Sequence, residues 1–134
     1  MTRRALPLLV ALALPLLAAL PAHADDLPYP AGTSEQQIEG RKTILVLPRE
    51  LSAKKRASLV VILHGAGGTA TGMAGAFAGW AQDGYVVCAP KSKGQVWEQD
   101  DLARVLRIAA HLKRVLPIDP AKVRDMAAAH FGGA

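Results

Sequence analysis

A glycine-rich segment that follows an apolar run carries the chemistry that this sequence could perform. Residues 64–68 read His-Gly-Ala-Gly-Gly and come directly after Leu-Val-Val-Ile-Leu at 59–63. Glycines let the backbone turn sharply and approach a ligand closely. Backbone N–H groups freed by such a turn, beside the start of a helix, stabilise a developing negative charge such as the oxyanion formed in acyl transfer. The segment therefore predicts an anion-receiving loop whose chemistry depends on its backbone.

The elements that must position this loop follow from hydrophobic patterning. The β-branched run at 59–63 has strand length, and its lack of polar residues favours a strand covered on both faces, as in a parallel sheet. The other expected elements are an extended lead-in at 25–34, a strand at 38–47, a helix at 69–82, a strand at 85–89, a helix at 98–116, a turn at 118–121 and a strand at 122–128. Strands alternating with helices predict an α/β fold, with a mostly parallel sheet and flanking helices.

The helix at 98–116 has the clearest pattern. Acidic residues occupy its first turn and basic residues its last, which suits the helix dipole. Its expected core-facing stripe consists of Leu102, Val105, Leu106, Ala109, Leu112 and Leu116.

Residues 1–24 have the layout of a secretory signal peptide. Two arginines precede an uncharged apolar run, and Ala-His-Ala at 22–24 places small residues where a signal peptidase reads them. The run is short for a membrane span and two prolines interrupt it, so we expect no stable span after cleavage. Cleavage near Ala24 would leave residues 25–134 as a single domain, secreted or periplasmic. The adjacent arginines leave the general and the twin-arginine export routes both open.

Net charge, cysteine content and histidine spacing limit what this chain is expected to bind. Without the two arginines of the leader, the formal net charge falls from +5 to +3, and the basic residues are not interleaved with aromatics, so no nucleic-acid partner is expected. The single cysteine, Cys88, lies in an apolar run and is expected to be a buried small hydrophobe. The four histidines show no metal-ligand spacing, and we expect neither metal nor cofactor.

Several motifs together resemble a known family. After His-Gly-x-Gly-Gly come Trp80, Gly-Tyr-Val-Val at 84–87, Pro90, Trp97 and Ile-Asp-Pro-Ala-Lys-Val at 118–123. Their order and spacing resemble the α/β-hydrolase superfamily, in particular secreted esterases of the polyhydroxybutyrate-depolymerase and feruloyl-esterase type. The resemblance implies an exported carboxylic-ester hydrolase of the serine type, acting on a small-molecule ester, a polyester or a polysaccharide ester.

The resemblance also implies where the site lies. The backbone N–H groups of Ala66, Gly67 and Phe131 would line the oxyanion hole. The side chain of His64 would act as a structural brace, since the catalytic histidine of this fold follows the nucleophile along the chain.

The sequence departs from the family pattern near its end. Gly-x-Ser-x-Gly is expected at 128–132, but His130 occupies the nucleophile position and Ala128 replaces the first glycine. The triad acid and histidine should come later in the chain, so we expect the N-terminal part of a hydrolase fold, truncated after the fifth strand and inactive as it stands. His130 would lack orienting partners and is not expected to act as a nucleophile. An exposed edge on the fifth strand would favour self-association.

Two other interpretations stay open at this point. Residues 65–70 also match G-x-G-x-x-A, the dinucleotide fingerprint of a Rossmann unit, and Lys91 and Lys93 could bind the 2′-phosphate of NADP. That would make the chain part of an NADP-binding oxidoreductase. Alternatively, the absent serine favours a non-catalytic secreted binding module on the hydrolase scaffold.

Overall fold

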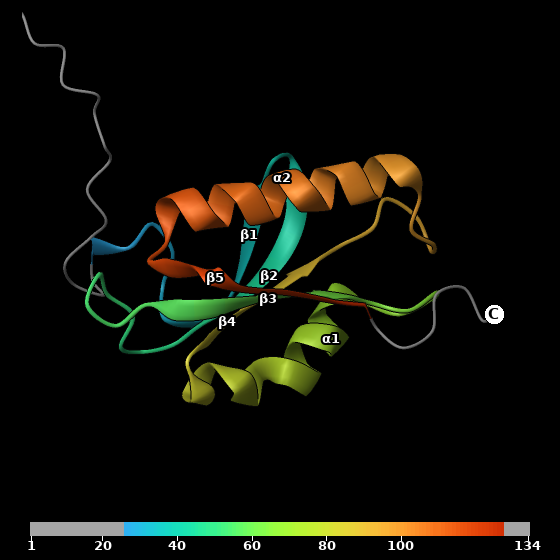
Figure 1. The fold of residues 1–134 in the computed structure, drawn as a ribbon. Helices are drawn as coiled ribbons and strands as arrows, with labels where there is room; N and C mark the ends of the chain where they lie inside the picture. The colour runs from blue at the N-terminus through green and yellow to red at the C-terminus, as the bar shows by residue number, and fades with distance from the viewer. Residues whose placement is uncertain (1–25, 128–134) are drawn as a thin grey trace, which may run out of the picture.

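A computed structural model describes residues 26–127, with the backbone alone for 124–127. In chain order, the elements are β1 (Gly32–Ile38), β2 (Arg41–Leu47), β3 (Ala57–Leu63), α1 (Ala70–Phe77), the 3₁₀ helix η2 (Ala78–Asp83), β4 (Tyr85–Pro90), α2 (Gln99–Val115) and β5 (Ile118–Ala127). One sheet forms the middle layer, with α2 on one face and α1 on the other (Figure 1). Among these elements, no helix is long and apolar enough to cross a membrane.

The five-stranded sheet is mixed, in the order β1-β2-β4-β3-β5. The β3 strand pairs in parallel with both β4 and β5, whereas β2 pairs antiparallel with β1 and with β4. Strand-helix-strand units therefore build its parallel part, as the alternating sequence pattern predicts. The expected α/β class with flanking helices is confirmed.

The β3 strand is the centre of the core. Leu59, Val61 and Leu63 face the cluster that contains the buried side of α2, while Val60 and Ile62 face the cluster that contains α1. All five are buried, because helices cover both faces of the sheet. The prediction of a strand covered on both sides is confirmed.

The first strand was not expected. In place of an extended lead-in and a single strand at 38–47, β1 and β2 form an antiparallel hairpin. Glu39 and Gly40 make its two-residue turn, with φ angles of 53° and 71°. Left-handed conformations at both central positions match the right-handed twist of the strands. The residues of β1 before Ile38 are polar and alternate between half-buried and exposed, as an edge strand allows, so apolar patterning does not reveal this strand.

The helix expected at 69–82 is two shorter helices. α1 ends at Phe77, and η2 continues to a left-handed Gly84 whose N–H donates to Ala81 and Trp80 carbonyls. Three glycines at 72, 75 and 79 weaken this stretch as a continuous α-helix. Tertiary packing therefore selects two short helices against β4.

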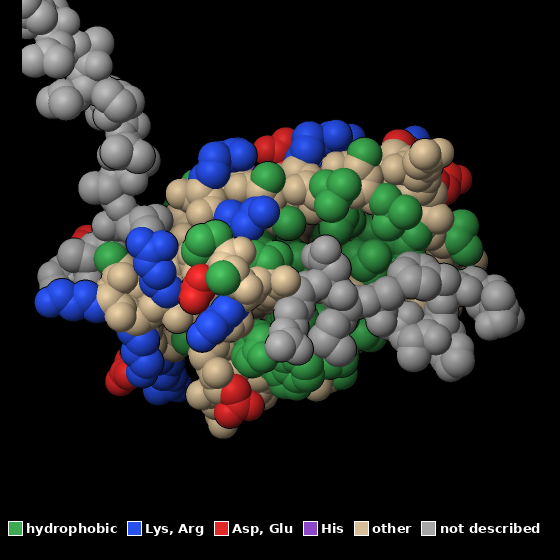
Figure 2. Space-filling view, in the orientation of Figure 1, with side chains coloured by type: hydrophobic (Ala, Val, Ile, Leu, Met, Phe, Trp, Pro, Cys, Tyr) green, Lys and Arg blue, Asp and Glu red, His purple; other side chains and the backbone are tan. Residues whose placement is uncertain are grey.

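The core-facing stripe of α2 was predicted partly wrong. Val105, Ala109 and Leu112 are buried as expected, but Leu102 and Leu106 are 43% and 66% exposed. Each residue advances roughly 100° around a helix, so Leu106 stands about a quarter turn from Val105 and leaves the buried face. The full buried set is Asp101, Val105, Ile108, Ala109 and Leu112, with Leu116 following. Figure 2 shows hydrophobic side chains gathered beneath α2 on the face toward the viewer.

The last strand begins earlier than predicted. β5 starts at Ile118, which pairs with Ala57, and its register then shifts so that Val123 pairs with Leu59. The intervening residues form a bulge in which the Asp119 carboxylate accepts from the Ala121 N–H at 3.0 Å. The expected turn at 118–121 therefore exists as a local side-chain turn inside the strand.

Candidate functional site

The glycine loop lies where β3 ends and α1 begins, at the carboxyl-terminal edge of the parallel strands. Thr69 is the N-cap of α1, and its hydroxyl accepts from the Gly72 N–H at 2.9 Å. In open α/β sheets, ligands bind outside the carboxyl ends of the strands. The predicted strand-loop-helix arrangement is present.

The loop is a tight turn that requires its glycines. The Gly68 N–H donates to the Gly65 carbonyl at 2.9 Å, closing a four-residue turn. Gly67 adopts a φ of +72°, in the left-handed region. A Cβ on Gly68 would stand 3.1 Å from the Gly65 oxygen. Ala66, at the remaining corner, is exposed.

The two predicted oxyanion donors of this loop, the N–H groups of Ala66 and Gly67, differ in their hydrogen bonding. The Gly67 N–H donates to the Gln95 carbonyl at 3.1 Å, so it already has an acceptor. The Ala66 N–H has no acceptor within residues 26–127. Ala66 is therefore the donor that this conformation leaves open to a ligand. His130 and Phe131, the other predicted site residues, lie outside the described part of the chain.

His64 is buried, and both of its ring nitrogens are engaged. Nδ1 lies 2.9 Å from the Gly65 carbonyl oxygen, and Nε2 accepts from the Ser92 N–H at 3.2 Å. A carbonyl oxygen only accepts, so Nδ1 carries the proton. With a proton on Nδ1 and an acceptor role at Nε2, the imidazole joins the ends of β3 and β4. This geometry supports the expected structural brace.

The segment after β4 is fastened to the same brace. Trp97 Nε1 donates to the His64 carbonyl at 2.8 Å, and the two rings lie 5.0 Å apart between centroids. Ser92, only 1% exposed, donates its hydroxyl hydrogen to the Gly94 carbonyl. Sequence reasoning missed Ser92 and Gln95, because their roles come from contacts with a loop nearly thirty residues earlier.

An ion pair between Arg41 and Asp101 holds the segment after β4 where it joins α2. The Asp101 carboxylate is fully buried and lies 2.6 Å from the Arg41 guanidinium. It also accepts from the backbone N–H groups of Lys93 and Glu98, at 3.1 and 3.0 Å. Burial by itself would raise the pKa of Asp101, but the hydrogen bonds from Arg41, Glu98 and Lys93 outweigh it and hold that pKa below its ordinary value.

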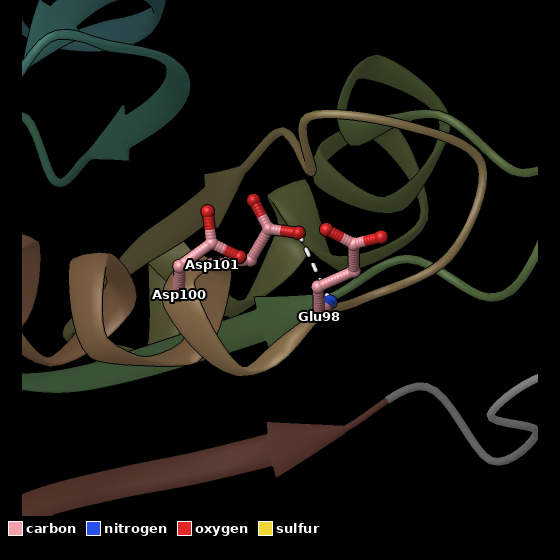
Figure 3. A group of neighbouring side chains, drawn as sticks. All are labelled: Glu98, Asp100 and Asp101. Carbon is pink, nitrogen blue, oxygen red and sulfur yellow. Dashed lines mark hydrogen bonds between the residues drawn. The ribbon is translucent and has the colours of Figure 1, made fainter.

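The acidic residues at the start of α2 form a cluster. One carboxylate oxygen from each of Glu98, Asp100 and Asp101 lies within 4.8 Å of the other two (Figure 3). Figure 3 shows the hydrogen bond from the Glu98 N–H to Asp101, which belongs to a capping box. Carboxylates are favourable at the N-terminus of a helix. The cluster is therefore explained as the cap of α2.

Cys88 is buried in β4, and burial raises the pKa of its thiol to about 12. The thiol stays protonated at neutral pH, and only a thiolate is a good nucleophile. The expectation that Cys88 is a buried small hydrophobe is confirmed.

Two hollows lie at opposite edges of the sheet. The larger, of about 690 Å³, lies at the amino-terminal edge, against Ala57 and Gly84. The smaller, of about 170 Å³, lies beside the glycine loop, against His64, Gly68 and Thr69. Because ligands of α/β sheets bind at the carboxyl ends of strands, the smaller hollow belongs to the candidate site despite its size.

Comparison of the sequence with models of protein families and with curated proteins finds no match. Solved structures with similar folds include an acetyl xylan esterase from Aspergillus awamori, with 18% sequence identity and a TM-score of 0.56. That alignment covers 73% of this chain and 43% of the esterase. TT1662 from Thermus thermophilus aligns with 18% identity and a TM-score of 0.39, over 65% of this chain and 40% of that one.

The first of these two structures defines the class of fold. The likeness to the esterase shows an α/β-hydrolase-like fold. The chain spans less than half the length of the structures it aligns with.

Proposed function

We propose that this chain belongs to the exported carboxylic-ester hydrolases of the serine-esterase and depolymerase type. The observation that carries the proposal is the Ala66 N–H, which is unpartnered within residues 26–127 and lies in a glycine turn between β3 and α1. The proposal is supported by the α/β-hydrolase-like fold, because the turn follows a central strand as the oxyanion loop does in the family that the sequence resembles. The substrate class is an ester of a small molecule, a polyester or a polysaccharide.

The role of the loop in acyl transfer follows from charge. When a nucleophile attacks an ester carbonyl, the carbonyl oxygen gains a negative charge, and a backbone N–H aimed at it stabilises the transition state. Ala66 supplies one donor directly. Gly67 becomes a second donor once the Gln95 carbonyl moves away. A substrate oxyanion and the Gln95 carbonyl therefore compete for the same N–H.

We further propose that hydrolysis by this chain stays far below that of a complete triad, because His130 stands at the nucleophile position. Oxyanion and binding effects alone leave a residual acceleration of about 10³ to 10⁴ over water. His130 makes no contribution to that residual rate.

Hydrolysis of p-nitrophenyl acetate tests both statements. Ala66→Pro removes the N–H, whereas Ala66→Gly keeps it and serves as the matched control. We expect Ala66→Pro to lower any residual rate by about 10² or more, as the loss of one oxyanion donor does, and Ala66→Gly and His130→Ala to leave it unchanged. A rate that depends on His130, or one indifferent to Ala66→Pro in a folded protein, would contradict the proposal.

The dinucleotide and binding-module interpretations make different predictions. Tight NADPH binding in a fluorescence titration would favour an oxidoreductase and remove support for the esterase. Retention on a polyester or carbohydrate matrix, with no hydrolysis by any variant, would favour a binding module.

A further inference from the structure

The smaller hollow beside the glycine loop has a distinctive charge. Lys42 at the start of β2 and Lys91 just after β4 both line it. Among the described lining residues, none carries a carboxylate. The hollow therefore presents positive charge beside the glycine loop, which lines it through Gly68 and Thr69.

Strand pairing holds the two lysines together. The Lys91 N–H donates to the Lys42 carbonyl at 3.0 Å, which continues the pairing of Thr43 with Pro90. Two ammonium groups from adjacent backbone positions repel each other unless an anion lies between them. The sheet thus keeps two like charges at the rim of one cavity.

Neither lysine is committed to a strong partner. Lys42 lies 3.2 Å from Glu35, but these side chains are 41% and 56% exposed, and such surface pairs contribute little to stability. Lys91 has no acidic partner within ion-pair distance in residues 26–127. Both ammonium groups can therefore turn toward a ligand at small cost.

Two other polar side chains of the hollow, His64 and Thr69, already have hydrogen-bond partners. His64 Nε2 accepts from the Ser92 N–H, and the Thr69 hydroxyl accepts from Gly72. These groups shape the cavity, and the lysines supply its recognition. At about 170 Å³, the cavity has room for a small acid group and not for a sugar ring with substituents.

We propose that this cavity binds the carboxylate of an ester that also carries a free acid group, with Lys42 and Lys91 as the residues that determine this specificity. The inference rests on the proposed function for the ester, whereas the carboxylate site stands on the cavity and its two lysines. Gly68, two residues after Ala66, lines the cavity, so the proposal puts the reacting carbonyl of an anionic ester on the side of the glycine loop. The preferred substrate is therefore a monoester of a short diacid or an ester with an acidic end.

The test compares two esters that differ by one charge. The full chain, labelled with ¹⁵N, is titrated with monomethyl succinate and with its neutral counterpart dimethyl succinate. We expect the anion to bind about tenfold more tightly, as one charge-assisted contact provides. The amide shifts should be confined to residues 41–43, 65–71 and 91–94. Added salt should weaken the binding of the anion and leave the binding of the neutral ester unchanged.

Substitutions test whether Lys42 and Lys91 cause the preference for the anion. Lys42→Gln with Lys91→Gln should remove the preference for the anion, and Lys113→Gln, an exposed lysine near the last turn of α2, should preserve it. Circular dichroism shows whether the double variant folds. If it does not, the single variant Lys91→Gln, at an exposed position, should lower the preference for the anion by about threefold or more. A threefold change corresponds to about half the binding free energy of a tenfold change.

Several results would overturn the inference. Equal affinity for the two esters, shifts outside the named segments, or an anion preference unchanged in folded Lys91→Gln would each do so. Inorganic phosphate that binds more tightly than monomethyl succinate would make this a phosphate site instead. Failure of the proposed function is distinguishable, because p-nitrophenyl acetate is neutral and its hydrolysis does not need the lysines.

Discussion

Individual hydrogen-bonding atoms decide what the residues around the loop can do. Both ring nitrogens of His64 have partners, so this histidine holds the backbone at the ends of β3 and β4. The Ala66 and Gly67 N–H groups are one residue apart, yet within residues 26–127 only Gly67 has an acceptor. The residue types predicted the loop. The hydrogen bonds of the folded chain distinguish the roles of Ala66 and Gly67.

Asp101→Asn tests the buried ion pair with Arg41. We expect a loss of about 3 kcal/mol at neutral pH, because removing one partner leaves a largely buried guanidinium without its counter-charge. The folded-state pKa of Asp101 lies below its unfolded value of about 3.9. The stabilisation is therefore present above about pH 4 and disappears as the pH falls through the folded-state pKa.

Urea unfolding from neutral pH down to about pH 3 measures this effect. The gap between wild type and Asp101→Asn should narrow in acid. Exposed Asp100→Asn, from the same helical turn, is the control and should change stability by no more than about 0.5 kcal/mol. A gap that stays constant with pH would show that the carboxylate charge is not responsible.

At the scale of elements, the unit β3–loop–α1 carries the candidate site. β3 is buried on both faces, and its end is fastened to the segment after β4 through His64, Ser92 and Trp97. The loop is thus exposed while its two ends are held. A rigid scaffold with an exposed turn is how folds present binding groups.

Two glycine-to-alanine changes in this unit should act in opposite directions. Gly67→Ala meets no steric neighbour, but its φ of +72° disfavours a side chain, so we expect a loss of about 1 kcal/mol. Gly75→Ala, in α1 with open space around it, should stabilise by up to about 1 kcal/mol. Urea midpoints measure both, and stabilisation by Gly67→Ala would contradict the left-handed turn.

At the scale of the whole molecule, β5 is an edge of the sheet that residues 26–127 form. It pairs with β3 on one side, and no strand within residues 26–127 pairs with its other side. Unpaired backbone groups along a strand are a template for another chain. We propose that a second copy pairs there.

Sedimentation velocity over a wide range of protein concentrations tests this pairing, with a rise in mean mass expected. Leu106→Glu, which removes the most exposed large hydrophobic on α2, should leave the association intact if the strand edge drives it. A monomer at every concentration, with a sharp cooperative melt, would contradict the proposal.

Export is also a property of the whole chain. We propose that residues 1–24 direct the protein to the periplasm or the medium and are removed near Ala24. N-terminal sequencing of exported protein should begin at Asp25. Ala24→Phe should block processing, because a signal peptidase needs a small residue there, whereas Ala18→Phe inside the apolar run should be processed. Normal cleavage of Ala24→Phe would place the site elsewhere.

The sequence by itself determined the strand at 59–63, the glycine loop after it and the long helix α2. These depend on local rules: β-branched residues suit a buried strand, glycines permit a tight turn, and a helical stripe repeats every few residues. The hairpin of β1 and β2 escaped those rules because its first strand is polar and its stability comes from pairing with a neighbour.

Only the tertiary structure decided how the site is held and which donor is open. The contacts of Gly67 with Gln95, and of Arg41 with Asp101, join positions about 30 and 60 residues apart in sequence. The pairing of Lys42 with Lys91 depends on the register of β2 against β4. Local propensity carries no information about such pairs, because only the closed sheet brings them within hydrogen-bond distance.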